Sequence, residues 1–183
     1  MHKDLKKIAE ITLKLLNNKS WVILSLQEVK QKSKVKSFDE LIKNKQELLN
    51  NINFYFDYSL TLQIKNLEDS DHKDMLFEIL MMRFDILQNN RKAILSVFQS
   101  FKQKPQELIF LLPQLLDSII SMIGYAKISN EGIIGQIKIK GILIIYISTF
   151  VVWIKDEDSS LEKTMTALDS YLNQVGKILN FIK

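Results

Sequence analysis

The sequence predicts an all-α fold, and three features of composition and spacing carry this prediction. The 183 residues include only two prolines and five glycines, which leaves few places for the tight turns of β-hairpins. Long stretches repeat apolar residues at intervals of three and four, the period of an amphipathic helix. A hydrophobic content of 46% is enough for a substantial core. We therefore expect a soluble protein of about nine helices.

The first quarter of the chain predicts three short helices followed by a long one. Leu5, Ile8 and Leu15 have helical spacing within residues 3–17, and Ser25 is placed to cap a helix over 26–32. A third short helix is expected near 35–42 and a long one over 45–66. This order is the outline of a helix-turn-helix module. We assign residues 1–45 to that module and 46–183 to a helical bundle that binds a ligand and dimerises.

The remaining helices are separated by turn residues and prolines. Two are expected over 71–88 and 90–103; the next begins near Pro105 and should kink at Pro113, leaving side-chain space beside it. The most apolar stretch, within a helix over 133–155, has about 14 residues and spans about 21 Å, which is short for a bilayer, so we expect a buried central helix. Ser159 and Glu162 form the S-x-x-E pattern of a capping box at the start of the last helix.

The last helix carries an apolar seam, which we call the C-terminal seam. Two interpretations stay open: the seam packs only within its own chain, or it also forms a homodimer interface. The residues assigned to it alternate in steps of four and three: Leu161, Met165, Leu168, Leu172, Val175 and Leu179.

The basic character of the chain is concentrated near its start. Residues 1–50 hold eleven lysines against six acidic residues, a balance of +5 in a chain whose total is +4. Four of these lysines form what we call the lysine cluster: Lys30, Lys32, Lys34 and Lys36. Such a cluster fits a DNA contact, a solvated face or a surface for anionic lipid.

The sequence offers little chemistry. It has no cysteine and two histidines, and it contains neither a Gly-rich phosphate loop nor a G-x-S-x-G motif. We therefore predict that the protein is not an enzyme and has no metal site or cofactor. No apolar leader is visible, which predicts a cytoplasmic protein; a peripheral contact with the inner membrane stays open.

Residues 146–175 resemble the C-terminal signature of the ubiquinone-biosynthesis accessory protein family. Tyr146, Thr149, Asp156, Thr164 and Leu168 fall on that signature with matching spacing. The resemblance implies a TetR-like fold that holds an isoprenoid or quinone lipid for a hydroxylase of ubiquinone synthesis. It leads us to expect an apolar tunnel lined by Phe77, Met81, Phe84, Leu112, Leu116, Ile120, Ile142, Tyr146 and Phe150.

One segment departs from that family. Its Asn-Trp-Tyr-Thr-Lys/Arg stretch, associated with lipid and hydroxylase contacts, is replaced here by residues 134–138, of which only Lys138 matches. The hydroxylase contact implied by the resemblance is thus not carried by the same side chains.

The N-terminal quarter also resembles the TetR family of transcriptional regulators, which supplies the alternative function of a ligand-responsive repressor. The third helix is about two residues shorter than the usual recognition helix and carries Asp39 and Glu40. Because carboxylates repel DNA phosphates, we expect DNA binding to be weak or lost.

Overall fold

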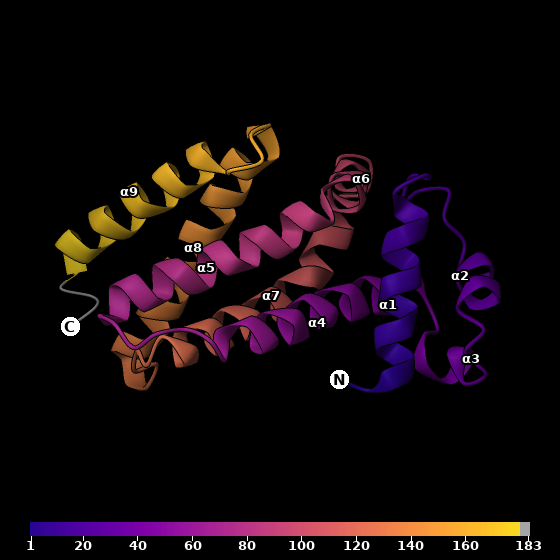
Figure 1. The fold of residues 1–183 in the computed structure, drawn as a ribbon, viewed down its shortest axis with the longest axis horizontal. Helices are drawn as coiled ribbons and strands as arrows, with labels where there is room; N and C mark the ends of the chain where they lie inside the picture. Colours follow the sequence, from indigo (N-terminus) through magenta and orange to yellow (C-terminus); the bar gives the residue numbers. More distant parts are fainter. Residues whose placement is uncertain (180–183) are drawn as a thin grey trace. The chain divides into compact units, whose positions relative to one another are not determined.

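The computed structural model describes residues 1–179, with side chains described up to residue 174. In this part of the chain it contains nine α-helices and no strand (Figure 1), which confirms the all-α prediction. The helices are α1 (Lys3–Leu16), α2 (Leu26–Ser33), α3 (Phe38–Leu41), α4 (Lys45–Ile64), α5 (His72–Asn89), α6 (Arg91–Phe101), α7 (Gln106–Tyr125), α8 (Gly132–Lys155) and α9 (Glu162–Leu179).

Most helix ends lie within two residues of the predicted ones. The Ser25 side chain accepts a hydrogen bond from the Glu28 N–H at 3.2 Å and starts α2, as predicted. α3 is much shorter than the predicted helix and consists of a single turn. α7 continues through Pro113, where the missing N–H leaves the carbonyl of Ile109 without its usual helical donor.

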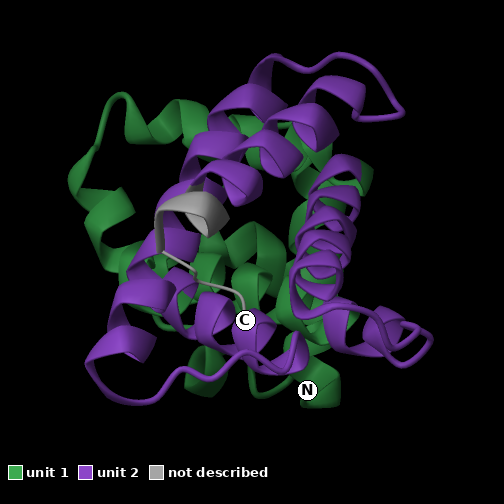
Figure 2. Ribbon diagram, turned by 90° about the vertical axis from the view of Figure 1, so that its left-hand side faces the viewer, with its two compact units in different colours: residues 1–59, 89–114 green, residues 60–88, 115–183 purple. Residues whose placement is uncertain are grey.

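The chain forms two compact units, shown in separate colours in Figure 2. The first unit contains residues 1–59 and 89–114, and the second contains residues 60–88 and 115–183. The chain changes unit three times: inside α4, at the last residue of α5 and inside α7. The helix-turn-helix-like module therefore shares its unit with most of α4, with α6 and with the start of α7.

The first unit is built around α1. One face of this helix buries Ile8 and Leu13, and α1 packs against both α2 and α6. Phe38, the first residue of α3, is also buried. The Asn51 side chain on α4 donates a hydrogen bond to the Leu5 carbonyl at 2.9 Å. α1 thus packs one amphipathic face into the core; of the residues with the predicted spacing Ile8 is buried, whereas Leu5 and Leu15 are half-buried.

The second unit is organised around α8. Phe84 of α5 stacks on Tyr146 with ring centroids 5.3 Å apart, and the Trp153 Nε1–H donates to Gln88 Oε1 at 3.1 Å. α8 also packs against α9, where Leu168 is fully buried. One face of α8 is therefore buried by its own unit.

The corner between α8 and α9 is held by a buried carboxylate. Asp156 has no exposed surface, and its Oδ2 accepts from Thr164 N at 2.8 Å and from Thr164 Oγ1 at 2.7 Å. α9 begins at Glu162 after Leu161, which has a left-handed φ of 57°. Asp156 thus takes the capping role that the sequence suggested for Ser159, because the helix starts later than the capping-box pattern implied.

Candidate functional site

The lysine cluster lies where α2 ends and the chain turns towards α3. Lys30 and Lys32 are in the last turn of α2, and Lys34 ends the helix with a left-handed φ of 53°. The Lys34 N–H donates to the Lys30 carbonyl at 3.1 Å. All four lysines of the cluster, Lys36 included, are exposed. Glycine is the usual residue in this left-handed position because it adopts it without strain. Here the position is occupied by a lysine, which adds a positive charge to the turn.

The single-turn α3 places acidic residues next to this cluster. Asp39 and Glu40 are exposed in its only turn, and the Lys30 ammonium forms an ion pair with Asp39. A recognition helix contacts base edges with its N-terminal residues and needs positive charge towards the phosphates. In α3 those positions carry carboxylates, and one of them already engages a lysine of the cluster.

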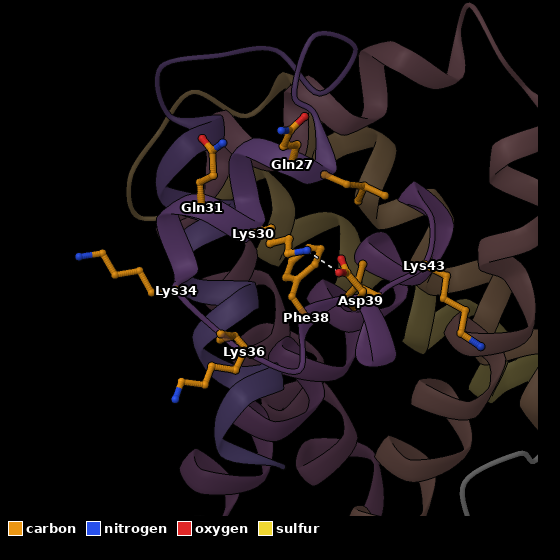
Figure 3. A pocket seen from close by; sticks show the side chains of 11 residues that line it. Gln27, Lys30, Gln31, Lys34, Lys36, Phe38, Asp39 and Lys43 are labelled. Carbon is orange, nitrogen blue, oxygen red and sulfur yellow. Dashed lines mark hydrogen bonds and ion pairs between the residues drawn. The ribbon is translucent and has the colours of Figure 1, made fainter.

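An open hollow of about 800 Å³ lies between α2 and α3. Figure 3 shows Lys30 turned towards Asp39, whereas Lys34, Lys36 and Lys43 extend outward in different directions. Their ammonium groups do not converge on one point, so the hollow is basic without forming a built anion site. It is lined by Leu26, Gln27, Lys30, Gln31, Lys34, Val35, Lys36, Phe38, Asp39, Ile42 and Lys43.

Lys45 joins the loop after α1 to the rest of the first unit. Its Nζ donates to the Trp21 carbonyl at 2.5 Å and to the Val22 carbonyl at 3.1 Å, and lies 5.3 Å from the centroid of the Trp21 ring. Burial lowers the pKa of Lys45, the charge of Glu107 opposes this shift, and the charge of Lys104 adds to it. Charges at the corner before α7 therefore act on the ammonium group that binds this loop.

The nine side chains predicted to line the apolar tunnel differ in burial. Phe84, Ile142 and Tyr146 are buried in the core of the second unit. Leu112 lies in the first unit and is exposed. The tunnel stays a prediction. The half-buried members all belong to the second unit: Phe77, Met81, Leu116, Ile120 and Phe150.

Three of the four described side chains of the C-terminal seam face their own chain. Leu161, Leu168 and Leu172 have at most 1% of their surface exposed, whereas Met165 is exposed; the side chains of Val175 and Leu179 lie outside the described ones. These three leucines pack against their own unit, and the homodimer interface expected at this seam stays a prediction. The sequence could not separate the two interpretations, since both require the same heptad spacing.

A different apolar stripe is exposed, and it runs along α8. Its spacing of three, four and seven residues keeps its members on one helix face. The expectation of a buried central helix therefore holds for only one side of α8. We call this set the α8 stripe: Ile133, Ile137, Ile144, Ile147 and Val151.

The first turns of α7 are also apolar and exposed, a feature that periodicity did not reveal. Leu108, Ile109, Phe110 and Leu112 all carry substantial exposed surface. Because this run is apolar at consecutive positions, it has no polar face from which exposure could be inferred. By length and composition alone α7 and α8 are both apolar enough to cross a membrane, and only 22% and 33% of their most apolar stretches are buried.

Comparison with known proteins supports the fold. No protein-family profile and no curated protein sequence matches the chain. Among solved structures, the chain is similar to a TetR transcriptional regulator from Nitrosomonas europaea ATCC 19718, with a TM-score of 0.75 and 17% sequence identity. The alignment covers 94% of this chain and 98% of the regulator. At this identity the likeness establishes a shared fold, so this chain is an all-α protein with a TetR-like architecture.

Proposed function

We propose that this chain is a lipid-binding protein that keeps a regulator's fold without reading DNA sequence. The observation that carries this proposal is the state of α3, a single turn with exposed Asp39 and Glu40. A helix of one turn offers too few side chains for a set of base contacts, and its charges oppose the phosphates. The protein would therefore act through its helical bundle, by binding a ligand and not by transforming it.

The ligand expected for that bundle is apolar. Half-buried Phe77 and Met81 on α5 and Phe150 on α8 belong to the same unit, and methionine and aromatic side chains adapt to long flexible hydrocarbons. Such side chains match an isoprenoid chain better than a charged metabolite, because they provide no partner for a buried charge.

The assignment to a quinone precursor, held for a hydroxylase of ubiquinone synthesis, rests on the resemblance of residues 146–175. Tyr146, Thr149 and Thr164 on that signature are buried, and Thr149 Oγ1 donates to the Ile145 carbonyl at 2.8 Å. These residues support the corner and the packing of α8. The signature therefore favours the fold more strongly than any particular headgroup.

A ligand-responsive repressor is the second candidate. It is favoured by the likeness to a solved transcriptional regulator and by the basic hollow between α2 and α3. The two candidates differ in one property: a repressor requires a DNA sequence that competes successfully with random duplex, whereas a lipid carrier does not.

We also propose that two copies associate through the α8 stripe. Five exposed apolar residues on one helix face are unusual on a monomer surface. An off-centre two-fold axis would pair the same face from each copy without placing the exposed Lys140 of one copy against that of the other. Ile144 is central in the stripe and 65% exposed.

Native mass spectrometry of the purified protein, followed by organic extraction, tests the lipid proposal. We expect a co-purifying lipid with a polyprenyl chain in the unmodified protein and in Met165→Glu, which changes an exposed methionine of α9. Met81→Glu should lose it, because a carboxylate beside the apolar chain is costly. Thermal unfolding of both variants checks that they fold. Recovery of no lipid, or equal recovery from Met81→Glu and the unmodified protein, would reject the proposal.

A further inference from the structure

Two exposed apolar segments of the first unit lie beside exposed lysines. The loop before α2 contributes Val22 and Ile23, and the first turns of α7 contribute Ile109 and Phe110. Ile23, Ile109 and Phe110 are 68%, 64% and 62% exposed. Single exposed apolar residues are ordinary on soluble proteins, but clusters of them are typical of interaction surfaces.

Hydrogen bonds tie the loop before α2 to α4 and α6. The Trp21 N–H donates to Ser96 Oγ at 2.7 Å and ties the loop to α6, the helix that leads into the corner before α7. Lys45 binds the carbonyls of Trp21 and Val22, and the charges of Lys104 and Glu107 act on the same ammonium. The loop contacts Lys45, and the charged corner before α7 acts on the same ammonium, within one compact unit.

The exposed charges beside these apolar residues indicate which kind of partner can bind them. Lys102 and Lys104 are exposed directly before the apolar run of α7, and Lys104 also forms an ion pair with Glu107 at 3.6 Å. A second copy meeting this surface across a two-fold axis would bring like charges together. An anionic bilayer accepts both features, because apolar side chains enter the headgroup boundary while lysines remain at the phosphates.

We infer that these residues form a docking patch for the surface of a membrane that contains anionic lipid. The patch consists of Val22, Ile23, Lys102, Lys104, Ile109 and Phe110. It is separate from the lysine cluster and from the apolar residues of the second unit. The inference goes beyond the proposed lipid binding, because a protein can hold a lipid without docking on a bilayer, and the reverse is equally possible.

Co-sedimentation of the full chain with vesicles tests the patch. Vesicles of phosphatidylcholine alone are compared with vesicles that also contain phosphatidylglycerol, at low and high salt. We expect binding to the anionic vesicles that weakens with salt. Ile109→Ser/Phe110→Ser should lower the partition coefficient at least about tenfold. Lys102→Gln/Lys104→Gln should lower it about thirtyfold, since each lysine near an anionic surface contributes about a factor of five.

Two matched variants keep the test specific. Phe54→Ser/Leu62→Ser removes two exposed apolar side chains of α4, and Lys32→Gln/Lys34→Gln removes two exposed lysines of the cluster; both should bind like the unmodified protein. Equal losses in the control and patch variants would overturn the inference, as would binding to neither vesicle. Loss of patch binding with the extracted lipid unchanged would separate docking from the proposed lipid carriage.

Discussion

Asp156 is the residue on which the corner before α9 depends. Burial raises the pKa of its carboxyl, but hydrogen bonds from Thr164 and from the Asp158 N–H outweigh burial and hold the pKa below its usual value. We expect Asp156→Asn to lower the free energy of unfolding by about 1–2 kcal/mol at neutral pH, the range for loss of a helix cap or of a charged hydrogen bond.

The same substitution has a defined pH dependence. Because the folded pKa of Asp156 is depressed, its stabilisation is present above the unfolded value of about 3.9 and is lost as the pH falls through the lower folded value. Urea unfolding at neutral pH and at pH values on both sides of that window should show the gap between Asp156→Asn and the unmodified protein closing in acid. A gap that stays constant would contradict this role for the carboxylate.

Gly135 is needed where α8 passes close to the preceding loop. A Cβ at this position would lie 2.0 Å from the carbonyl carbon of Asn130, and backbone cannot move away as a flexible side chain can. We expect Gly135→Ala to destabilise the protein by about 1–3 kcal/mol. In the matched variant Gly124→Ala the new methyl meets nothing within 4 Å, so stability should stay equal or rise by up to about 1 kcal/mol. Equal thermal shifts for both variants would contradict the close approach.

At the scale of the elements, the lysine cluster should support only weak DNA binding that is indifferent to sequence. Since Lys30 is engaged by Asp39, three lysines meeting one phosphate each would give a log-log salt slope of about −3, because each contact releases about 0.9 counterion. Fluorescence anisotropy at several salt concentrations measures this slope. Asp39→Asn should steepen it towards about −4 by releasing Lys30.

A matched pair of variants assigns that binding to the cluster. Glutamine at all four cluster lysines should abolish it. Glutamine at four other exposed lysines should leave it nearly unchanged; suitable positions are Lys65, Lys92, Lys140 and Lys155. If the cluster variant and the control variant show the same salt slope, the lysines that bind DNA lie elsewhere on the protein.

The α8 stripe gives the prediction for assembly. Ile144→Glu places a carboxylate at the centre of the proposed interface, where it would be buried without a partner. Light scattering should report a dimer for the unmodified protein and a monomer for this variant. Met165→Glu, on the exposed side of α9, serves as the control and should remain dimeric. A monomeric unmodified protein at about 10 μM would contradict the dimer.

Helix positions were predictable from the sequence because they depend on local spacing and caps, as Ser25 at the start of α2 illustrates. Which face of each helix is buried was less predictable. Leu168 and Ile144 both occupy regular apolar positions, yet one is fully buried and the other is exposed, because burial depends on which neighbouring helix covers each face. The exposed start of α7 escaped prediction for the same reason.

The residues of the signature in 146–175 have structural roles in the fold. Asp156 and Thr164 satisfy each other at a helix start, and Tyr146 stacks in the core. These positions are constrained by packing, so they predict the fold, which the solved regulator's similarity supports. Specificity for a ligand or for a DNA sequence depends on other side chains.

In the whole molecule, the proposed function makes DNA binding and lipid binding independent, whereas a repressor must couple them. The lysine cluster belongs to the first compact unit, and the half-buried apolar residues belong to the second. In a repressor, ligand binding changes affinity for one DNA sequence. In the lipid-binding protein proposed here, glutamine at the four cluster lysines should leave lipid recovery unchanged.

A competition titration decides whether this protein reads a DNA sequence. The protein is bound to labelled duplex taken from the DNA flanking its own gene, and unlabelled random duplex is added in increasing excess. We expect random duplex to displace the protein as effectively as the unlabelled flanking duplex does, because the single turn of α3 offers too few side chains to read bases. A complex that survives a large excess of random duplex and yields only to one flanking sequence would contradict the account and establish a sequence-specific repressor.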